Sequence, residues 1–229
     1  MSRYFLSLIF ILILSCSPLR EYRELPEVRA WDKEIEKFEE LDSKENYPDD
    51  AIIFAGSSSI RLWSTLAEDM APYHVIRRGY GGAKLSDIAV YAERIFSPHL
   101  CKAVVIFIAN DITGGNQDKS PEEVKRLFLN VLRTIRESHP DVPVFWIAIT
   151  PTSSRWKAWP EISKANDLIS RTCLNRRNTY FIRTDFAFLN EKGEPRDELF
   201  ISDKLHLNRE GYKVWTSIIK EELDKVLSN

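Results

Sequence analysis

The sequence predicts an α/β protein: a three-layer α/β/α sandwich built on a parallel sheet of about five strands in a flavodoxin-like order. Short apolar runs alternate with longer amphipathic stretches along the chain, which is the pattern of strands joined by right-handed crossover helices. The apolar runs are continuous rather than alternating, so each strand is expected to be buried on both faces. Polar residues with chemical potential follow several of these runs, at the edge where such sheets bind ligands.

Five apolar runs are the predicted strands. The first begins at Ala51 and ends at Gly56, where the lack of a Cβ allows the chain to reverse. The run at 103–109 is the most continuous one beyond the N-terminal segment and is the best candidate for a central strand. The other three strands are expected at 73–77, 144–149 and 179–183.

Amphipathic stretches predict the helices. Residues 27–41 carry apolar side chains at helical spacing among charged ones, which is typical of a helix packed on the outside of a domain. Ser120 and Pro121 supply an N-cap and a proline at the first helical position, the clearest helix start in the sequence. Further helices are expected after Ser58, at 85–96, at 161–174 and after the N-cap residue Asn208.

The N-terminus has the pattern of a secretory signal. Arg3 precedes an apolar run at 4–14 that is too short to cross a bilayer but suits the central region of a signal peptide. The run ends at Ile13-Leu14-Ser15-Cys16, which resembles the bacterial lipobox and implies cleavage before Cys16 and lipidation of its thiol. An ordinary secretory signal and an uncleaved anchor are the alternatives.

The predicted organisation is a signal peptide at 1–15, a tether at 16–26 and one domain at 27–229, which is long enough for an ample core. Lys and Arg number 32 against 34 Asp and Glu, so the chain lacks the basic excess of a non-specific nucleic-acid binder, and no nucleic acid partner is expected. Cys101 and Cys173 are expected to be buried free thiols. No metal-ligand spacing joins cysteines and histidines, so no metal is predicted.

Four residues or turns at the ends of predicted elements can together perform acyl transfer. Ser58 lies among three serines at a predicted helix N-terminus, where free N–H groups favour negative charge, so it can act as a nucleophile or merely help to cap the helix. His206 can take its proton, and Asp203 can fix the imidazole tautomer. The backbone N–H groups of Ser58 and Gly82, with the side-chain amide of Asn110, can form an oxyanion hole.

The loop at 150–160 adds candidate substrate-binding residues. Arg155, Trp156 and Trp159 are polar or aromatic loop residues beside the predicted site, a setting in which such residues line acyl or sugar pockets. An α/β-hydrolase would need a glycine two residues after the nucleophile, but this position is Ile60, which disfavours that fold.

Taken together, these motifs resemble the SGNH hydrolase superfamily, also called the GDSL-type esterases. Its four blocks are matched in order by Gly56-Ser57-Ser58, Arg78-Gly79-Tyr80-Gly81-Gly82, Asn110-Asp111 and Asp203-Lys204-Leu205-His206. The residues around His206 are similar to the subgroup of platelet-activating-factor acetylhydrolase subunits. The resemblance covers about residue 50 to the C-terminus. It implies the SGNH hydrolase fold and a serine esterase that needs no cofactor.

Two positions depart from the family pattern. Ser57 stands where aspartate is usual, and Ile108 stands where the third block normally has glycine, two residues before Asn110. A branched side chain at Ile108 can alter the loop that carries Asn110, so two functions stay open. The leading one is an esterase of small carboxylic esters, with an acyl-Ser58 intermediate and with lysophospholipase or thioesterase as variants. The other is a catalytically impaired surface protein that binds glycan or lipid.

The lipobox adds an expected location. Lipidation at Cys16 implies an exported protein anchored to a bacterial membrane or cell surface. From that location alone, an O-acetylated glycan is a slightly more attractive substrate than other small esters.

Overall fold

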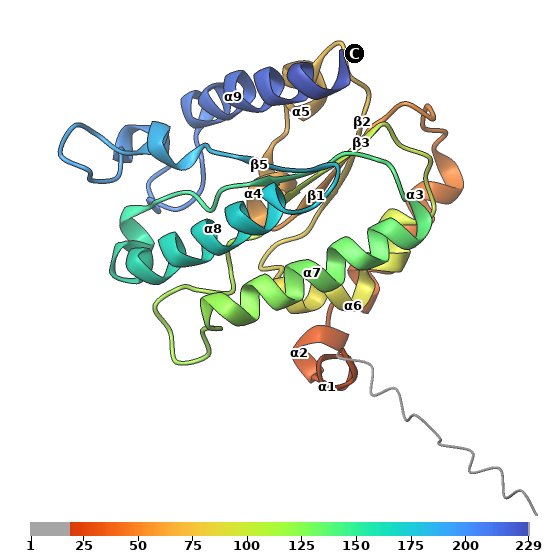
Figure 1. Cartoon of the computed structure of the whole chain (residues 1–229), viewed down its shortest axis with the longest axis horizontal. Helices are drawn as coiled ribbons and strands as arrows, with labels where there is room; N and C mark the ends of the chain where they lie inside the picture. Colours follow the sequence, from red (N-terminus) through yellow and green to blue (C-terminus); the bar gives the residue numbers. More distant parts are fainter. Residues whose placement is uncertain (1–18, 229) are drawn as a thin grey trace, which may run out of the picture.

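The computed structural model describes residues 19–228, in which two layers of helices cover the two faces of a five-stranded sheet (Figure 1). All neighbouring strands are parallel, and their order is β2-β1-β3-β4-β5. This is the predicted flavodoxin-like order. The strands are β1 (Ile52–Gly56), β2 (Val75–Gly79), β3 (Ala103–Phe107), β4 (Val144–Ile147) and β5 (Thr179–Ile182).

Helices α6 (Leu85–Phe96), α7 (Pro121–Ser138) and α8 (Trp159–Leu174) cover one face of the sheet, and α4 (Ser58–Leu62), α5 (Leu66–Met70) and α9 (Arg209–Leu227) cover the other. Figure 1 shows α5 and α9 on the side of the sheet opposite α6 and α7. Three short 3₁₀ helices lie in the connections: η1 (Ser153–Ala158), η2 (Asp185–Phe188) and η3 (Asp197–Leu199).

The period-two alternation along each strand divides the apolar core in two. In β1, Ile53 packs with the layer of α6, α7 and α8, whereas Phe54 packs with the layer of α4, α5 and α9. In β3, Val104 and Val105 divide in the same way. Both faces are therefore buried, which is the reason the strands appear in the sequence as unbroken apolar runs.

The predicted helix caps are confirmed. Ser120 Oγ accepts the Glu123 N–H at 3.2 Å, with Pro121 as the first helical residue, and α7 begins there. Asn208 Oδ1 accepts the Gly211 N–H at 3.0 Å at the start of α9. Each cap satisfies one of the N–H groups that a helix N-terminus leaves without an intrahelical acceptor.

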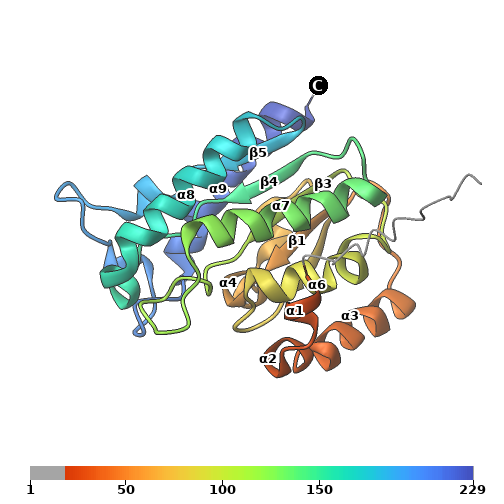
Figure 2. The same cartoon turned by 60° about the horizontal axis from the view of Figure 1, so that its bottom comes forward.

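The N-terminal part differs from expectation in two ways. The single helix expected at 27–41 is two helices, α2 (Pro26–Arg29) and α3 (Asp32–Lys44), because the chain turns at Trp31 and the indole packs on Tyr80 with ring centroids 4.9 Å apart. The expected tether also contains structure, since α1 (Arg20–Arg23) lies within it. Figure 2 shows α1, α2 and α3 next to α6.

Residues 19–26 therefore belong to the folded domain rather than to a free linker. Leu19 and Tyr22 are buried in the core on the α6 and α7 side, and the Tyr22 hydroxyl donates to Glu123 Oε1 at 2.7 Å. Apolar burial of these two side chains is the physical reason that the linker orders. The expected signal peptide at 1–15 and Cys16 lie outside the described residues.

Cys101 and Cys173 are buried free thiols, as predicted. Within residues 19–228, no group of His, Cys, Asp and Glu side chains is placed to hold a metal ion. In the same range, every helix is too short or too polar to cross a membrane.

Candidate active site

The turn between β1 and α4 places Ser58 at the carboxyl edge of the sheet. Gly56 ends β1 so close to β3 that a Cβ on it would lie 2.1 Å from the Phe107 carbonyl oxygen, which explains why glycine precedes the serines. The Ser57 N–H donates to that same Phe107 oxygen at 3.0 Å, and Ser57 is the N-cap residue of α4. Ser58, the first residue of α4, is thus fixed at a helix N-terminus.

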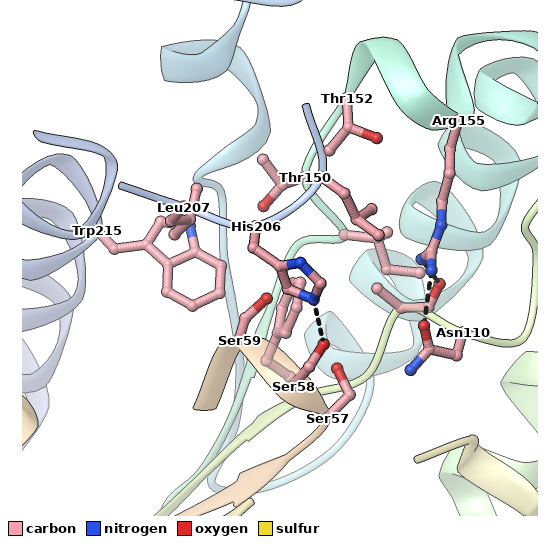
Figure 3. A pocket seen from close by; sticks show the side chains of 14 residues that line it. Ser57, Ser58, Ser59, Asn110, Thr150, Thr152, Arg155, His206, Leu207 and Trp215 are labelled. Atoms are coloured by element: carbon pink, nitrogen blue, oxygen red, sulfur yellow. Dashed lines mark hydrogen bonds between the residues drawn. The ribbon is translucent and has the colours of Figure 1, made fainter. Parts of the chain in front are cut away.

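The structure brings together the three residues predicted as nucleophile, base and orienting carboxylate. Ser58 Oγ lies 2.9 Å from His206 Nε2 (Figure 3), and His206 Nδ1 lies 2.6 Å from Asp203 Oδ2. An ionised carboxylate only accepts hydrogen bonds, so the proton on Nδ1 belongs to the imidazole and Nε2 accepts from the serine hydroxyl.

Asp203 is held by its own turn. Its Oδ1 accepts the backbone N–H groups of Leu205 and His206, both at 2.9 Å, and Lys204, which directly follows Asp203, has a left-handed φ of 54°. Burial raises the pKa of the Asp203 carboxyl, but the hydrogen bonds from His206 and Leu205 outweigh burial and hold this pKa below its usual range. Asp203 therefore stays ionised beside the imidazole.

A second network ties this turn to η1. Lys204 Nζ lies 2.7 Å from Asp197 Oδ2, and the Ser153 hydroxyl donates to Asp197 Oδ1 at 2.6 Å. The Ser154 N–H donates to the Lys204 carbonyl at 3.3 Å. The loop that follows β4 and the turn that carries His206 are thus joined by side-chain and backbone contacts.

Asn110 follows β3 and lies on the other side of Ser58. Its Nδ2 donates to the Ala83 carbonyl at 2.9 Å, and its Oδ1 accepts from Arg155 at 2.7 Å (Figure 3). A second guanidinium nitrogen of Arg155 donates to the Ala109 carbonyl. Gly82 immediately precedes Ala83 and has a left-handed φ of 78°, a conformation that glycine adopts without strain.

Two buried carboxylates order the segment behind Gly82 and Asn110. Asp111 accepts the Leu85 N–H at 2.8 Å and lies 3.3 Å from Lys119 Nζ, and Asp87 accepts the Lys84 N–H at 2.8 Å. Burial raises the pKa of Asp87 to about 6, and burial also raises the pKa of Asp111 although Lys119 opposes it. The start of α6, which follows Gly82, is therefore held by two carboxyl groups whose ionised forms are destabilised by burial.

The pocket around Ser58 combines an apolar wall with a few polar groups. The hydroxyls of Thr150 and Thr152 are buried and have no hydrogen-bond partner within residues 19–228. Both threonines follow β4, and this position after a parallel strand is the only feature of the sequence that indicates a place in the site. The pocket is lined by Ser57, Ser58, Ser59, Phe107, Ala109, Asn110, Ile149, Thr150, Thr152, Arg155, Leu205, His206, Leu207 and Trp215.

The remaining predicted site residues fall in different places. Arg155 lines the pocket, whereas Gly82, Trp156 and Trp159 are outside its lining. The two indoles stack on each other, with ring centroids 6.0 Å apart and planes 13° from parallel, and Trp156 is 36% exposed. Ile108 is buried in the core on the α6 to α8 side, and the Asn110 amide two residues later keeps both hydrogen bonds.

Comparison with known families gives one match, to the GDSL-like Lipase/Acylhydrolase family over residues 46–214. A comparison with curated proteins gives no match. Many solved structures share the fold.

Three solved structures illustrate this similarity at 15% identity each. A provisionally named platelet activating factor from Streptococcus pneumonia aligns with a TM-score of 0.76, and the alignment covers 86% of this chain and 94% of that protein's chain. A GDSL-like lipase from Bacteroides thetaiotaomicron has a TM-score of 0.69, with coverages of 84% and 98%. A carbohydrate esterase family 3 protein from Talaromyces cellulolyticus has a TM-score of 0.62, with coverages of 78% and 98%. At this identity the likeness concerns the fold.

Proposed function

We propose that this chain, which belongs to the GDSL-like lipase/acylhydrolase family, is a serine esterase that cleaves small carboxylic esters through an acyl-Ser58 intermediate. Membership of the family makes ester hydrolysis the general activity. The observation that supports the specific mechanism is the hydrogen-bond chain from Ser58 Oγ through His206 to Asp203, with spacings of 2.9 and 2.6 Å. Such a chain is what a weakly acidic hydroxyl needs to become a nucleophile.

The first half-reaction acylates the serine. Ser58 Oγ attacks the ester carbonyl carbon while His206 Nε2 takes the hydroxyl proton, and the carbonyl electron pair moves onto oxygen. The resulting imidazolium is stabilised by ionised Asp203. Collapse of the tetrahedral intermediate breaks the bond to the alcohol oxygen, which leaves with the proton from His206 Nε2.

The second half-reaction repeats these steps with water. His206 Nε2 takes a proton from water, the hydroxide attacks the acyl carbon, and Ser58 leaves with that proton. The products are one carboxylic acid and one alcohol, and the enzyme is regenerated. In both half-reactions the negative oxygen is stabilised by the Ser58 N–H and by Asn110 Nδ2, both in the pocket lining, because fixed donors cost little reorganisation during the reaction. The Gly82 N–H is the third proposed donor, although Gly82 lies outside that lining.

The proposed substrate class is acetyl or short acyl esters, with O-acetylated carbohydrate favoured. The pocket wall has Ile149, Leu207 and Trp215 for a short apolar acyl group and the unpartnered hydroxyls of Thr150 and Thr152 for polar substrate groups. One of the similar folds is a carbohydrate esterase, and the partly exposed indole of Trp156, the residue after Arg155 in the chain, is a candidate for stacking on a sugar.

Ester hydrolysis and covalent labelling test this function together. The protein lacking residues 1–18 is expected to hydrolyse p-nitrophenyl acetate and to react with a fluorophosphonate at Ser58, as located by peptide mass spectrometry. Ser58→Ala is expected to lose both properties with an unchanged circular dichroism spectrum, whereas Ser64→Ala, a control on an exposed serine, keeps both. A wild-type protein that neither hydrolyses esters nor reacts would refute the esterase and favour a binding protein of the same fold.

We also propose that the protein is exported and anchored to a membrane through lipid on Cys16. The support is the lipobox-like sequence, Ile13 to Cys16, after an apolar run. Metabolic labelling with a palmitate analogue in a bacterial host, with Cys16→Ser as the variant and Cys173→Ser as the control, is expected to show label on wild type and control only. Equal labelling of Cys16→Ser would contradict the anchor.

A further inference from the structure

Arg155 places a positive charge in the pocket wall, and no carboxylate within residues 19–228 forms a salt bridge with it, although Asp118 and Asp111 act on it electrostatically. It lines the pocket together with Ser58 and Asn110. Both of its hydrogen bonds go to neutral acceptors, the Ala109 carbonyl and Asn110 Oδ1, and Arg155 forms no salt bridge with any residue in the range 19–228. A guanidinium stays charged even when partly buried, and its field is screened less there than in bulk water.

The two hydrogen bonds of the Asn110 side chain select one orientation of its amide. Nδ2 donates to the Ala83 carbonyl at 2.9 Å, and Oδ1 accepts from Arg155 at 2.7 Å. A flipped amide would place oxygen against the Ala83 carbonyl and an NH₂ group against the guanidinium, and both contacts are repulsive. The second Nδ2 hydrogen has no protein acceptor within the described part of the chain, and Asn110 lines the pocket.

We infer that Arg155 is a positioning residue that acts through Asn110: it locks the amide and polarises it, so that Nδ2–H donates more strongly to the oxyanion. This inference rests on the proposed esterase function. A hydrogen bond from a cation to an amide oxygen is stronger than one between neutral groups. Hydrogen bonds in a chain also polarise one another, so the charge on Arg155 strengthens the donor at the far side of the amide.

The loop that carries Arg155 is itself fixed to the catalytic turn. Ser153, two residues earlier, donates to Asp197, which also contacts Lys204 beside Asp203. The same short helix, η1, therefore contacts both the turn with His206 and the amide of Asn110. This arrangement keeps the distance between base and oxyanion donor constant, as positioning of a transition state requires.

A double-mutant cycle tests whether Arg155 acts through Asn110. With p-nitrophenyl acetate, a neutral ester, Arg155→Met is expected to lower kcat by about 10-fold or somewhat more with KM little changed, less than the 10²- to 10³-fold typical for losing the donor itself. In the Asn110→Ala background, Arg155→Met is expected to have no further effect on kcat. Arg155→Lys, which keeps the charge but not the planar fork, should recover part of the rate.

Lys157→Met is the matched control, because Lys157 is an exposed cation in the same helix and makes none of these contacts. It is expected to keep the wild-type kcat and KM. Circular dichroism and melting temperature monitor the folding of every variant.

Four results would overturn the inference. Multiplicative effects of Arg155→Met and Asn110→Ala would show that Arg155 acts independently of the amide. A rise in KM with unchanged kcat would make Arg155 a substrate-binding residue. A wild-type kcat in Arg155→Met, with active wild-type enzyme, would remove Arg155 from the reaction and leave the esterase proposal intact. An inactive wild-type protein that does not react with fluorophosphonate would remove both.

Discussion

The two halves of the site are built in different ways. In the half that contains Ser58, His206 and Asp203, the carboxylate that orients the base is held within its own turn, because Asp203 accepts N–H groups two and three residues further along the chain. In the half that contains Gly82 and Asn110, the fixing groups come from distant segments, since Arg155 lies 45 residues from Asn110 in the sequence.

This difference separates reactivity from stabilisation. In the proposed mechanism, the first half supplies the nucleophile and its base, and the second adds donors for charge that develops only during reaction. If the separation holds, substitutions in the first half remove the reaction, and substitutions in the second half slow it or destabilise the fold.

His206→Ala is expected to lower kcat with p-nitrophenyl acetate by about 10⁴-fold or more, because the serine then lacks its base. Fluorophosphonate labelling of Ser58 should fall in parallel. His74→Ala, which removes an exposed histidine outside the site, serves as the control. Activity within tenfold of wild type would show that another group accepts the serine proton.

Asn110→Ala is expected to lower kcat by about 10²- to 10³-fold, the usual effect of losing one oxyanion donor. Fluorophosphonate should still reach Ser58, although more slowly, because the serine and its base are unchanged. Asn130→Ala, in which the lost side chain only donates to a carbonyl of its own helix, is the control. A loss as large as that of His206→Ala would break the separation of the two halves.

Lys119→Met tests whether the second half depends on distant support. It leaves the buried Asp111 carboxylate without its cation at 3.3 Å, a loss that typically costs about 3 to 5 kcal/mol for a buried pair. Urea unfolding should show a lower free energy of unfolding. The exposed-lysine variant Lys157→Met should unfold like wild type. Equal stability of Lys119→Met and wild type would show that Asp111 is neutral or hydrated.

Asp87→Asn tests the pH dependence of the same segment. Burial raises the pKa of Asp87 to about 6, above the ordinary 3.8 of an aspartate. Between these two pH values Asp87 is more protonated in the folded protein than in the unfolded chain. The contribution of protonated Asp87 to the free energy of unfolding is therefore fully present below pH 4 and is lost as pH rises through 6. Relative to wild type, Asp87→Asn should gain about 2 to 3 kcal/mol between pH 4 and pH 7.

Melting curves of both proteins across this pH range measure the effect. A stability difference that stays constant with pH would contradict the raised pKa of Asp87. Asp49→Asn, an exposed carboxylate far from α6 in the sequence, provides the baseline for the substitution itself.

The same difference between the halves decides how much the sequence could predict. Strand order, the caps at Ser120 and Asn208 and the meeting of Ser58 with His206 follow from local patterns and from the common edge of parallel strands. The contact of Arg155 with Asn110 could not be predicted, because no local pattern specifies which loop residue reaches an amide 45 positions away.

The N-terminal error has a similar origin. The sequence predicts a polar tether at 16–26 because Leu19 and Tyr22 stand among charged residues in a short segment. Their burial depends on α6 and α7, and on Glu123 as partner of the Tyr22 hydroxyl. Such tertiary contacts override a weak local signal.

The burial of Leu19 also limits how far the enzyme could reach. Cys16 lies three residues before Leu19, and three extended residues span at most about 10 Å. With lipid on Cys16, as proposed, this short segment would hold the domain directly at the membrane surface. The active site would then act on esters at that membrane surface. Esters in the bulk medium would have to diffuse to the membrane to reach it.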